Sequence, residues 1–136
     1  MIRVGVIGYG LSAKVFHLPF ICASKDYILT AICSRQPQPL AFINEQVSAC
    51  QPQIFTQPLE LITSKLVDLV VITAPNHVHF CLAKHCLQNN LHVVVEKPMA
   101  VTLAEGEALT VLAKKNKLLL SVFHNRRWDS DFLTVK

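Results

Sequence analysis

The stretch VGVIGYGLSAKVFHLP, residues 4–19, decides the fold. A short apolar run leads into a turn in which Gly8, Gly10 and Ala13 have the spacing G-x-G-x-x-A. Between a strand and a helix, such a turn cradles phosphates. The first glycine permits the turn, the second lets the backbone approach a pyrophosphate, and the small third residue allows close helix packing. A strand–helix turn that binds nothing can have the same spacing, so the remaining sequence must supply the context.

Apolar, β-branched runs alternate with helical stretches along the rest of the chain. The sequence predicts strands over 2–7, 28–33, 53–55, 67–72, 92–96 and 118–123, and helices over 11–23 (kinked at Pro19), 40–47, 77–90 and 103–116. Strands that are apolar throughout and alternate with helices indicate a parallel sheet covered on both faces. We therefore expect a single α/β domain with a Rossmann-type, doubly wound parallel sheet of about six strands.

Length and composition limit the possible classes of protein. The chain has 136 residues, of which 51% are hydrophobic and 16% charged, as expected for one globular domain. No apolar stretch approaches the roughly 18 residues of a membrane span, and the N-terminus enters the first strand without a secretory leader. The five cysteines include no C-x-x-C pair, which favours reduced thiols. We expect a cytoplasmic protein without a membrane partner.

Two other partner classes are disfavoured. The net charge of +4 is modest and its basic residues are spread along the chain, whereas a nucleic-acid surface needs a denser basic patch with aromatic platforms. His77, Cys81 and His85 share one helical face, with Cys86 beside it, but no second ligand cluster has metal-site spacing. We expect neither nucleic acid nor metal to bind.

The end of the second strand indicates which dinucleotide binds. A carboxylate there bonds the adenosine ribose and favours NAD. This strand ends in Cys33, Ser34 and Arg35, which offer a hydroxyl and a planar cation suited to a phosphate. The sequence thus predicts NADP, with NAD as the alternative, because an arginine at a strand end can also be a plain surface residue.

Two further motifs follow the fourth and fifth predicted strands. TAPNHVHF occupies residues 73–80 and EKPMA occupies residues 96–100. Both stand at the carboxyl ends of strands, where open α/β sheets bind ligands. Taken alone, the E-K-P segment could equally be an exposed strand end with a solvated ion pair. Similarly, His17 near the predicted kink either faces the cofactor or caps the local turn.

With these three motifs in this order, the chain resembles the Gfo/Idh/MocA family of oxidoreductases. The family carries a glycine turn, a T-P-N-like turn and an E-K-P motif, and the resemblance runs along the whole chain. GYGLSAKVFHLP and HNRRWDSDF are most similar to its branch of NADP-dependent inositol and sugar dehydrogenases.

The resemblance implies roles for individual residues. Thr73, Pro75 and Asn76 line the ribose and nicotinamide side of the cofactor. Glu96 and Lys97 lie beside the nicotinamide, with Lys97 near the reacting carbon–oxygen group, where an ammonium can stabilise an alkoxide or relay its proton. A cis peptide before Pro98 turns Lys97 inward. The predicted cofactor-binding set is Gly8, Gly10, Leu11, Ser12, Ala13, Ser34, Arg35, Thr73, Pro75, Asn76, Glu96 and Lys97, and Lys97 is also the predicted catalytic residue.

The resemblance also bears on domain organisation. Members of the family continue into a second domain that supplies much of the substrate pocket. We expect residues 1–124 to form the dinucleotide-binding domain and residues 125–136 to begin the connection to such a domain. Two functions stay open: the cofactor-binding half of an oxidoreductase, inactive as this chain alone, or a dinucleotide-binding module without catalysis. A small-molecule substrate is expected only with the second domain, and the oligomeric state is left open.

Overall fold

The computed structural model describes residues 1–35 and 45–135 and contains one six-stranded parallel sheet. Its strands are β1 (Ile2–Ile7), β2 (Tyr27–Cys33), β3 (Gln53–Phe55), β4 (Leu69–Ile72), β5 (His92–Glu96) and β6 (Leu120–Phe123). They lie in the order β3-β2-β1-β4-β5-β6. The chain moves outward from β1 first toward β3 and then toward β6. A ligand crevice is expected where these two directions part, at the carboxyl end of β1. The predicted Rossmann-type fold is confirmed.

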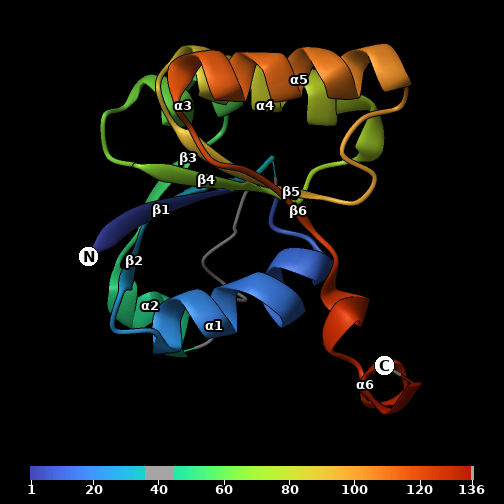
Figure 1. Cartoon of the computed structure of the whole chain (residues 1–136). Coiled ribbons are helices and arrows are strands. Elements are labelled where there is room, and N and C mark those ends of the chain that lie inside the picture. Colours follow the sequence, from blue (N-terminus) through green and yellow to red (C-terminus); the bar gives the residue numbers. More distant parts are fainter. Residues whose placement is uncertain (36–44, 136) are drawn as a thin grey trace.

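Helices cover both faces of the sheet (Figure 1). The covering helices are α1 (Leu18–Ala23), α2 (Glu45–Cys50), α3 (Pro58–Thr63), α4 (His79–Gln88) and α5 (Leu103–Asn116), and α6 (Ser130–Val135) follows the last strand. α1 and α2 pack on one face and α3, α4 and α5 on the other, each over its own buried apolar cluster. β1 serves both clusters: Val4 and Val6 face α1, whereas Ile7 belongs to the cluster under α3 to α5. This alternation follows from the two-residue period of a strand.

The helical stretch after the glycine turn differs from a simple proline kink. Residues 13–17 form a π-turn, in which the amide of Leu18 donates to the carbonyl of Ala13, five residues back. α1 then begins, with Pro19 in its first turn. Because Pro19 has no N–H to donate, it is tolerated at a helix start. The predicted irregularity is present, but it lies before Pro19 and places His17 at the end of the π-turn.

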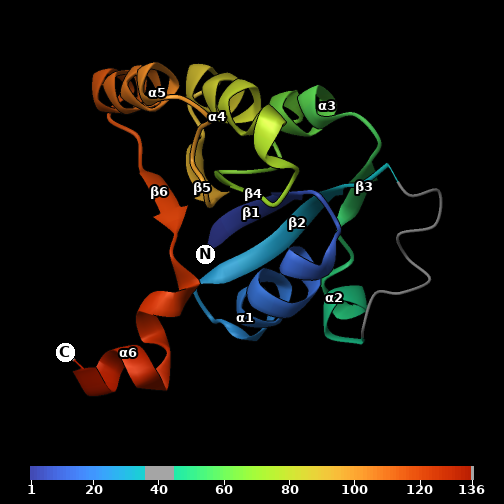
Figure 2. The ribbon, with the colours of Figure 1, turned by 90° about the vertical axis from the view of Figure 1, so that its right-hand side faces the viewer.

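Two other elements depart from the sequence prediction. The predicted helix over 40–47 lies largely outside the described residues, and α2 occupies Glu45–Cys50. α3 was not predicted: it has only six residues, begins at Pro58, and buries Leu61 and Ile62. Beyond β6, a 3₁₀ turn at Asn125–Trp128 and α6 extend past the sheet (Figure 2).

A pair at the amino ends of the central strands gives a prediction about stability. The Arg3 guanidinium donates to both carboxyl oxygens of Asp68, at 2.6 and 3.1 Å, and the Arg3 amide donates to Oδ2 at 2.9 Å. These hydrogen bonds lower the pKa of Asp68 from 3.8 to about 2. A carboxyl whose pKa is lowered by folding stabilises the fold fully above its unfolded pKa and loses that contribution as the pH falls.

We expect urea unfolding of Asp68→Asn to show a shallower loss of stability between about pH 4 and pH 2 than wild type. Because both side chains are well exposed, solvent screening makes the difference small. Identical pH profiles would contradict this expectation.

Candidate functional site at the carboxyl edge of the sheet

The glycine turn is fixed between the ends of three strands. Gly8 has a φ of 102°, in the left-handed region that favours glycine. Its amide donates to the carbonyl of Cys33 at the end of β2 (3.0 Å), and its carbonyl accepts from the Thr73 hydroxyl after β4 (2.9 Å). The Thr73 amide in turn donates to the carbonyl of Ile7 (2.9 Å). Thr73 therefore holds the glycine turn in this structure, whatever it contributes to a ligand.

Gly10 and the first helical residues form an open cradle. A Cβ on Gly10 would lie in open space. Among the described residues, and apart from the residues next to Gly10 in the sequence, no heavy atom lies within 4 Å of its position. Leu11 is 76% exposed, whereas Ala13 is fully buried and lets the helix pack on the sheet. An open glycine at the start of a helical stretch that follows a β-strand suits a pyrophosphate, since the first helical amides face it. The residues present fit the phosphate group of a dinucleotide.

A hydrogen-bonded network, Ser12–Glu96–His17, joins the glycine turn to the E-K-P segment. The Ser12 hydroxyl donates to Glu96 Oε1, and His17 Nε2 lies 3.0 Å from the same oxygen. The side chains of His17 and Glu96 are 6% and 16% exposed, and the His17 ring packs on Phe123 with a centroid separation of 4.3 Å. The helical stretch after the glycine turn and the end of β5 thus meet at one carboxylate, and the end of β6 packs on its partner His17.

The charge of Glu96 follows from its partners. Burial alone would raise the pKa of this carboxyl, but the hydrogen bonds from Ser12, His17 and the Lys97 amide, together with the electrostatic attraction of His17, hold the pKa below its ordinary value. Glu96 is therefore ionised at neutral pH. Ser12 was predicted to bind the cofactor, yet here its hydroxyl donates to Glu96.

Lys97 and the turn after β4 lie next to this network in the fold. The peptide between Lys97 and Pro98 is cis, as predicted. Lys97 is exposed at the edge of the sheet, so it is accessible to a ligand but is not turned into the interior. Pro75 and Asn76 are exposed at the start of the 3₁₀ turn before α4.

A buried histidine that the sequence prediction missed connects these two turns. His79 is fully buried, and its ring nitrogens lie 2.7 Å from the carbonyl oxygens of Ala74 and Pro98. It therefore fixes the backbone beside Pro75 and beside Lys97. The available signal was a polar residue within an otherwise apolar helical face, directly after the T-A-P-N turn.

The carboxyl edge of the sheet continues to the end of β2, where Ser34 and Arg35 lie. Ser34 is 5% exposed, and its amide donates to the carbonyl of Phe55 in β3 (2.9 Å). Arg35 is exposed. The ends of β1, β2, β4 and β5 thus bring all the predicted residues to one edge, with Arg35 on the β2 side and Lys97 on the β5 side.

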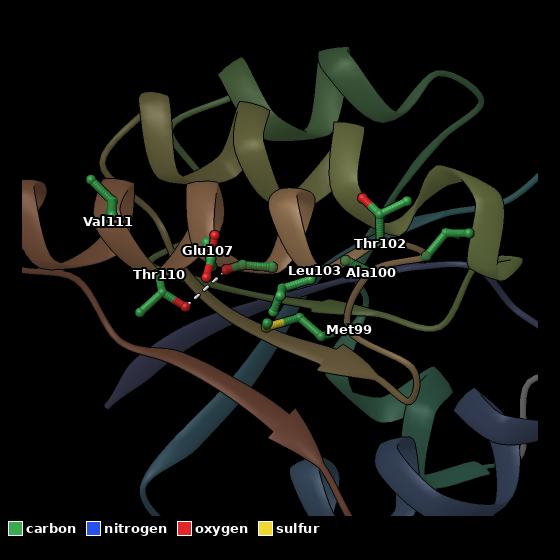
Figure 3. A pocket seen from close by; sticks show the side chains of 9 residues that line it. Met99, Ala100, Thr102, Leu103, Glu107, Thr110 and Val111 are labelled. Carbon is green, nitrogen blue, oxygen red and sulfur yellow. Dashed lines mark hydrogen bonds between the residues drawn. The ribbon is translucent and has the colours of Figure 1, made fainter.

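Two cavities lie outside this predicted set. One, of about 610 Å³, lies on the α1 face of the sheet and includes His17, Phe123, Arg126 and Trp128 in its lining. The other, of about 790 Å³, lies along the start of α5, where Met99 and Leu103 point toward Thr110 (Figure 3). Neither contains a residue predicted to bind the cofactor.

Two expected absences can be compared with the described part of the chain. Within residues 1–35 and 45–135, no three histidine, cysteine, aspartate or glutamate side chains gather closely enough to hold a metal ion. Over the same residues, no helix has both the length and the apolar character that crossing a bilayer requires. The five cysteines all lie within the described residues and form no disulfide, although the Cys50 thiol donates to Cys22 Sγ at 3.6 Å, and burial raises the pKa of Cys86 to about 12.

Comparison with known proteins places the chain among oxidoreductases. The family model GFO_IDH_MocA, described as an oxidoreductase family with an NAD-binding Rossmann fold, matches residues 2–124. The oxidoreductase YdgJ of Escherichia coli is 45% identical, over 99% of this chain and 38% of its own length. The scyllo-inositol 2-dehydrogenase (NADP(+)) IolW of Bacillus subtilis is 39% identical, over 99% of this chain and 36% of its own.

The solved structures agree with the sequence relatives. The crystal structure of an oxidoreductase from Bacillus cereus has a TM-score of 0.84 and 32% identity, covering 99% of this chain and 38% of that chain. This chain therefore spans less than two fifths of the length of each of these three proteins.

Proposed function

This chain belongs to the Gfo/Idh/MocA family of oxidoreductases, and from that membership we propose that it is the cofactor-binding part of an enzyme that transfers a hydride between NADP(H) and a polyol, sugar or similar alcohol. The observation that carries the proposal is the open Gly10 cradle, which shares one edge of the sheet with Glu96 and Lys97. This edge can take an extended dinucleotide, with its pyrophosphate at the glycine turn.

The strand order supports one side of the sheet for each half of the cofactor. The end of β2 takes the adenosine ribose, so the nicotinamide half extends the other way, over β4 and β5. Thr73, Pro75, Asn76, Glu96 and Lys97 stand on that side. A bound nicotinamide supplies the hydride donor or acceptor. In the direction of reduction, the Lys97 ammonium would stabilise the developing alkoxide of the substrate and donate a proton from Nζ to it.

We propose NADP as the preferred cofactor. Arg35 is exposed at the end of β2, where its guanidinium can pair with a ribose phosphate, and the relative IolW is named for NADP(+). We propose the cytoplasm as the compartment, because cysteines that form no disulfide persist where glutathione keeps thiols reduced.

Cofactor choice is tested by isothermal titration of NADPH and NADH. We expect NADPH to bind more tightly. Arg35→Asp should erase or reverse the preference, a change of roughly 10- to 100-fold, since it replaces a charge-assisted hydrogen bond by repulsion. Arg127→Asp, at an exposed arginine beyond β6, is the matched control and should leave the preference unchanged. Equal affinities, or tighter binding of NADH, would overturn the NADP assignment.

A second candidate function is a dinucleotide-binding module that catalyses nothing by itself. It is favoured by one observation: the chain spans less than two fifths of its relatives, in which other parts of the protein can hold the substrate. Joining the chain to the remaining length of a relative such as IolW separates the two functions: turnover that is lost in Lys97→Ala supports the oxidoreductase, whereas NADPH binding without turnover supports the module.

A further inference from the structure

The Ser12–Glu96–His17 network does more than join two loops, because it fixes one negative charge at a defined place. Both partners contact the same oxygen, Glu96 Oε1, from segments that lie 84 and 79 residues away in the sequence. Phe123, at the end of the neighbouring strand β6, packs against the His17 ring. The carboxylate is therefore restrained in position and largely shielded from water.

The place of this charge matters for the cofactor. Glu96 is the last residue of β5, on the side of the sheet that we propose for the nicotinamide half. The oxidised nicotinamide ring carries a positive charge and the reduced ring carries none. The pyrophosphate and ribose groups are the same in both forms. A fixed carboxylate on this side thus acts differently on the two redox states, while its repulsion of the phosphates affects both equally.

We infer that Glu96 is a specificity-determining residue that favours the oxidised over the reduced dinucleotide, and that Ser12 and His17 are the positioning residues that hold it. This inference rests on the proposed function, since it requires a nicotinamide over β4 and β5. Shielding strengthens the effect, because an attraction between charges is larger where water is excluded. The inference also gives a role to His17 and to the π-turn that ends at His17. Such π-turns are frequently found at functional sites.

The ratio of two dissociation constants isolates this effect. Titration of the 136-residue chain with NADP⁺ and with NADPH gives Kd(NADP⁺)/Kd(NADPH), and the expected change for Glu96→Gln is a rise of roughly five- to tenfold. Glutamine keeps the volume and can still accept from Ser12, so the fold should persist. Glu96→Asp keeps the charge and should stay closer to wild type.

His17 is tested separately, so that the proposal stays falsifiable if a Glu96 variant fails to fold. His17→Leu removes the hydrogen bond and should raise the ratio in the same direction as Glu96→Gln, by a smaller factor. His17→Gln retains an amide donor and should restore most of the wild-type ratio. His85→Gln, at an exposed position on α4, is the matched control and should leave the ratio unchanged.

The outcomes separate this inference from the proposed function. If neither cofactor form binds to the folded wild-type chain, the proposed function fails. If both forms bind and Glu96→Gln weakens or strengthens them equally, the inference is wrong and Glu96 only ties the two loops together. A ratio that rises in Glu96→Gln and in His17→Leu, but in neither Glu96→Asp nor His85→Gln, supports it.

Discussion

Gly8→Ala is expected to destabilise the fold by roughly 2–5 kcal/mol and to abolish dinucleotide binding. A Cβ on Gly8 would lie 2.8–2.9 Å from the hydroxyl, carbonyl carbon and carbonyl oxygen of Thr73, closer than such atoms can approach. The positive φ of Gly8 adds a penalty that glycine alone avoids. Since two of the three atoms belong to the backbone, relief requires the glycine turn or the end of β4 to move. Urea unfolding measures the first effect and calorimetric titration with NADPH the second.

Gly10→Ala is the matched control for this prediction. Its Cβ enters open space, so the free energy of unfolding should stay close to that of wild type. The methyl group would still occupy the cradle that the pyrophosphate needs, and NADPH binding should weaken. If Gly8→Ala unfolds at the same urea concentration as Gly10→Ala, the close contact with Thr73 is not a constraint and the account of this turn is wrong.

The chain alone is expected to bind NADP(H) but to show negligible turnover on polyols and sugars. Lys97 offers an ammonium at the carboxyl edge of the sheet, yet hydride transfer also requires a substrate held in a near-attack geometry. Poor positioning can forfeit roughly 7–11 kcal/mol of barrier reduction, far more than one lysine can restore. The relatives are more than twice as long as this chain, and we attribute the missing positioning to the rest of their length.

The assay follows the absorbance of reduced nicotinamide with inositols, aldoses and small ketones as substrates. Wild type and Lys97→Ala should both give rates close to the reaction without protein. Robust turnover by wild type that is lost in Lys97→Ala would show that this domain builds a complete site by itself, and would contradict the prediction.

The fold could be predicted from the sequence because its elements carry strong local signals. β1, β4 and β5 are apolar, β-branched runs buried on both faces, and α5 has a capping box from Thr102 and Glu105. α3 escaped prediction because six residues give little periodicity, and its only sharp marker is Pro58 in the first turn. The π-turn was missed because a proline predicts a distortion without specifying its form.

The candidate site could be predicted only in part. The motifs after β1, β4 and β5 converge on one edge because parallel strands place their carboxyl ends together. The contacts among them could not be foreseen: that Ser12 donates to Glu96, or that His79 lies between Ala74 and Pro98, depends on packing between segments distant in sequence. The sequence singles out His17, but it does not indicate Glu96 as its partner.

The central claim is that the carboxyl edge of this sheet binds a dinucleotide, with its pyrophosphate at the glycine turn. An NMR titration of the ¹⁵N-labelled chain with NADPH tests it most directly. The largest amide shifts are predicted at Gly8, Gly10 and Ser12, with further shifts at Arg35 and Glu96. Saturating NADPH that leaves these amides unmoved, or that shifts only amides along α5, would contradict the account.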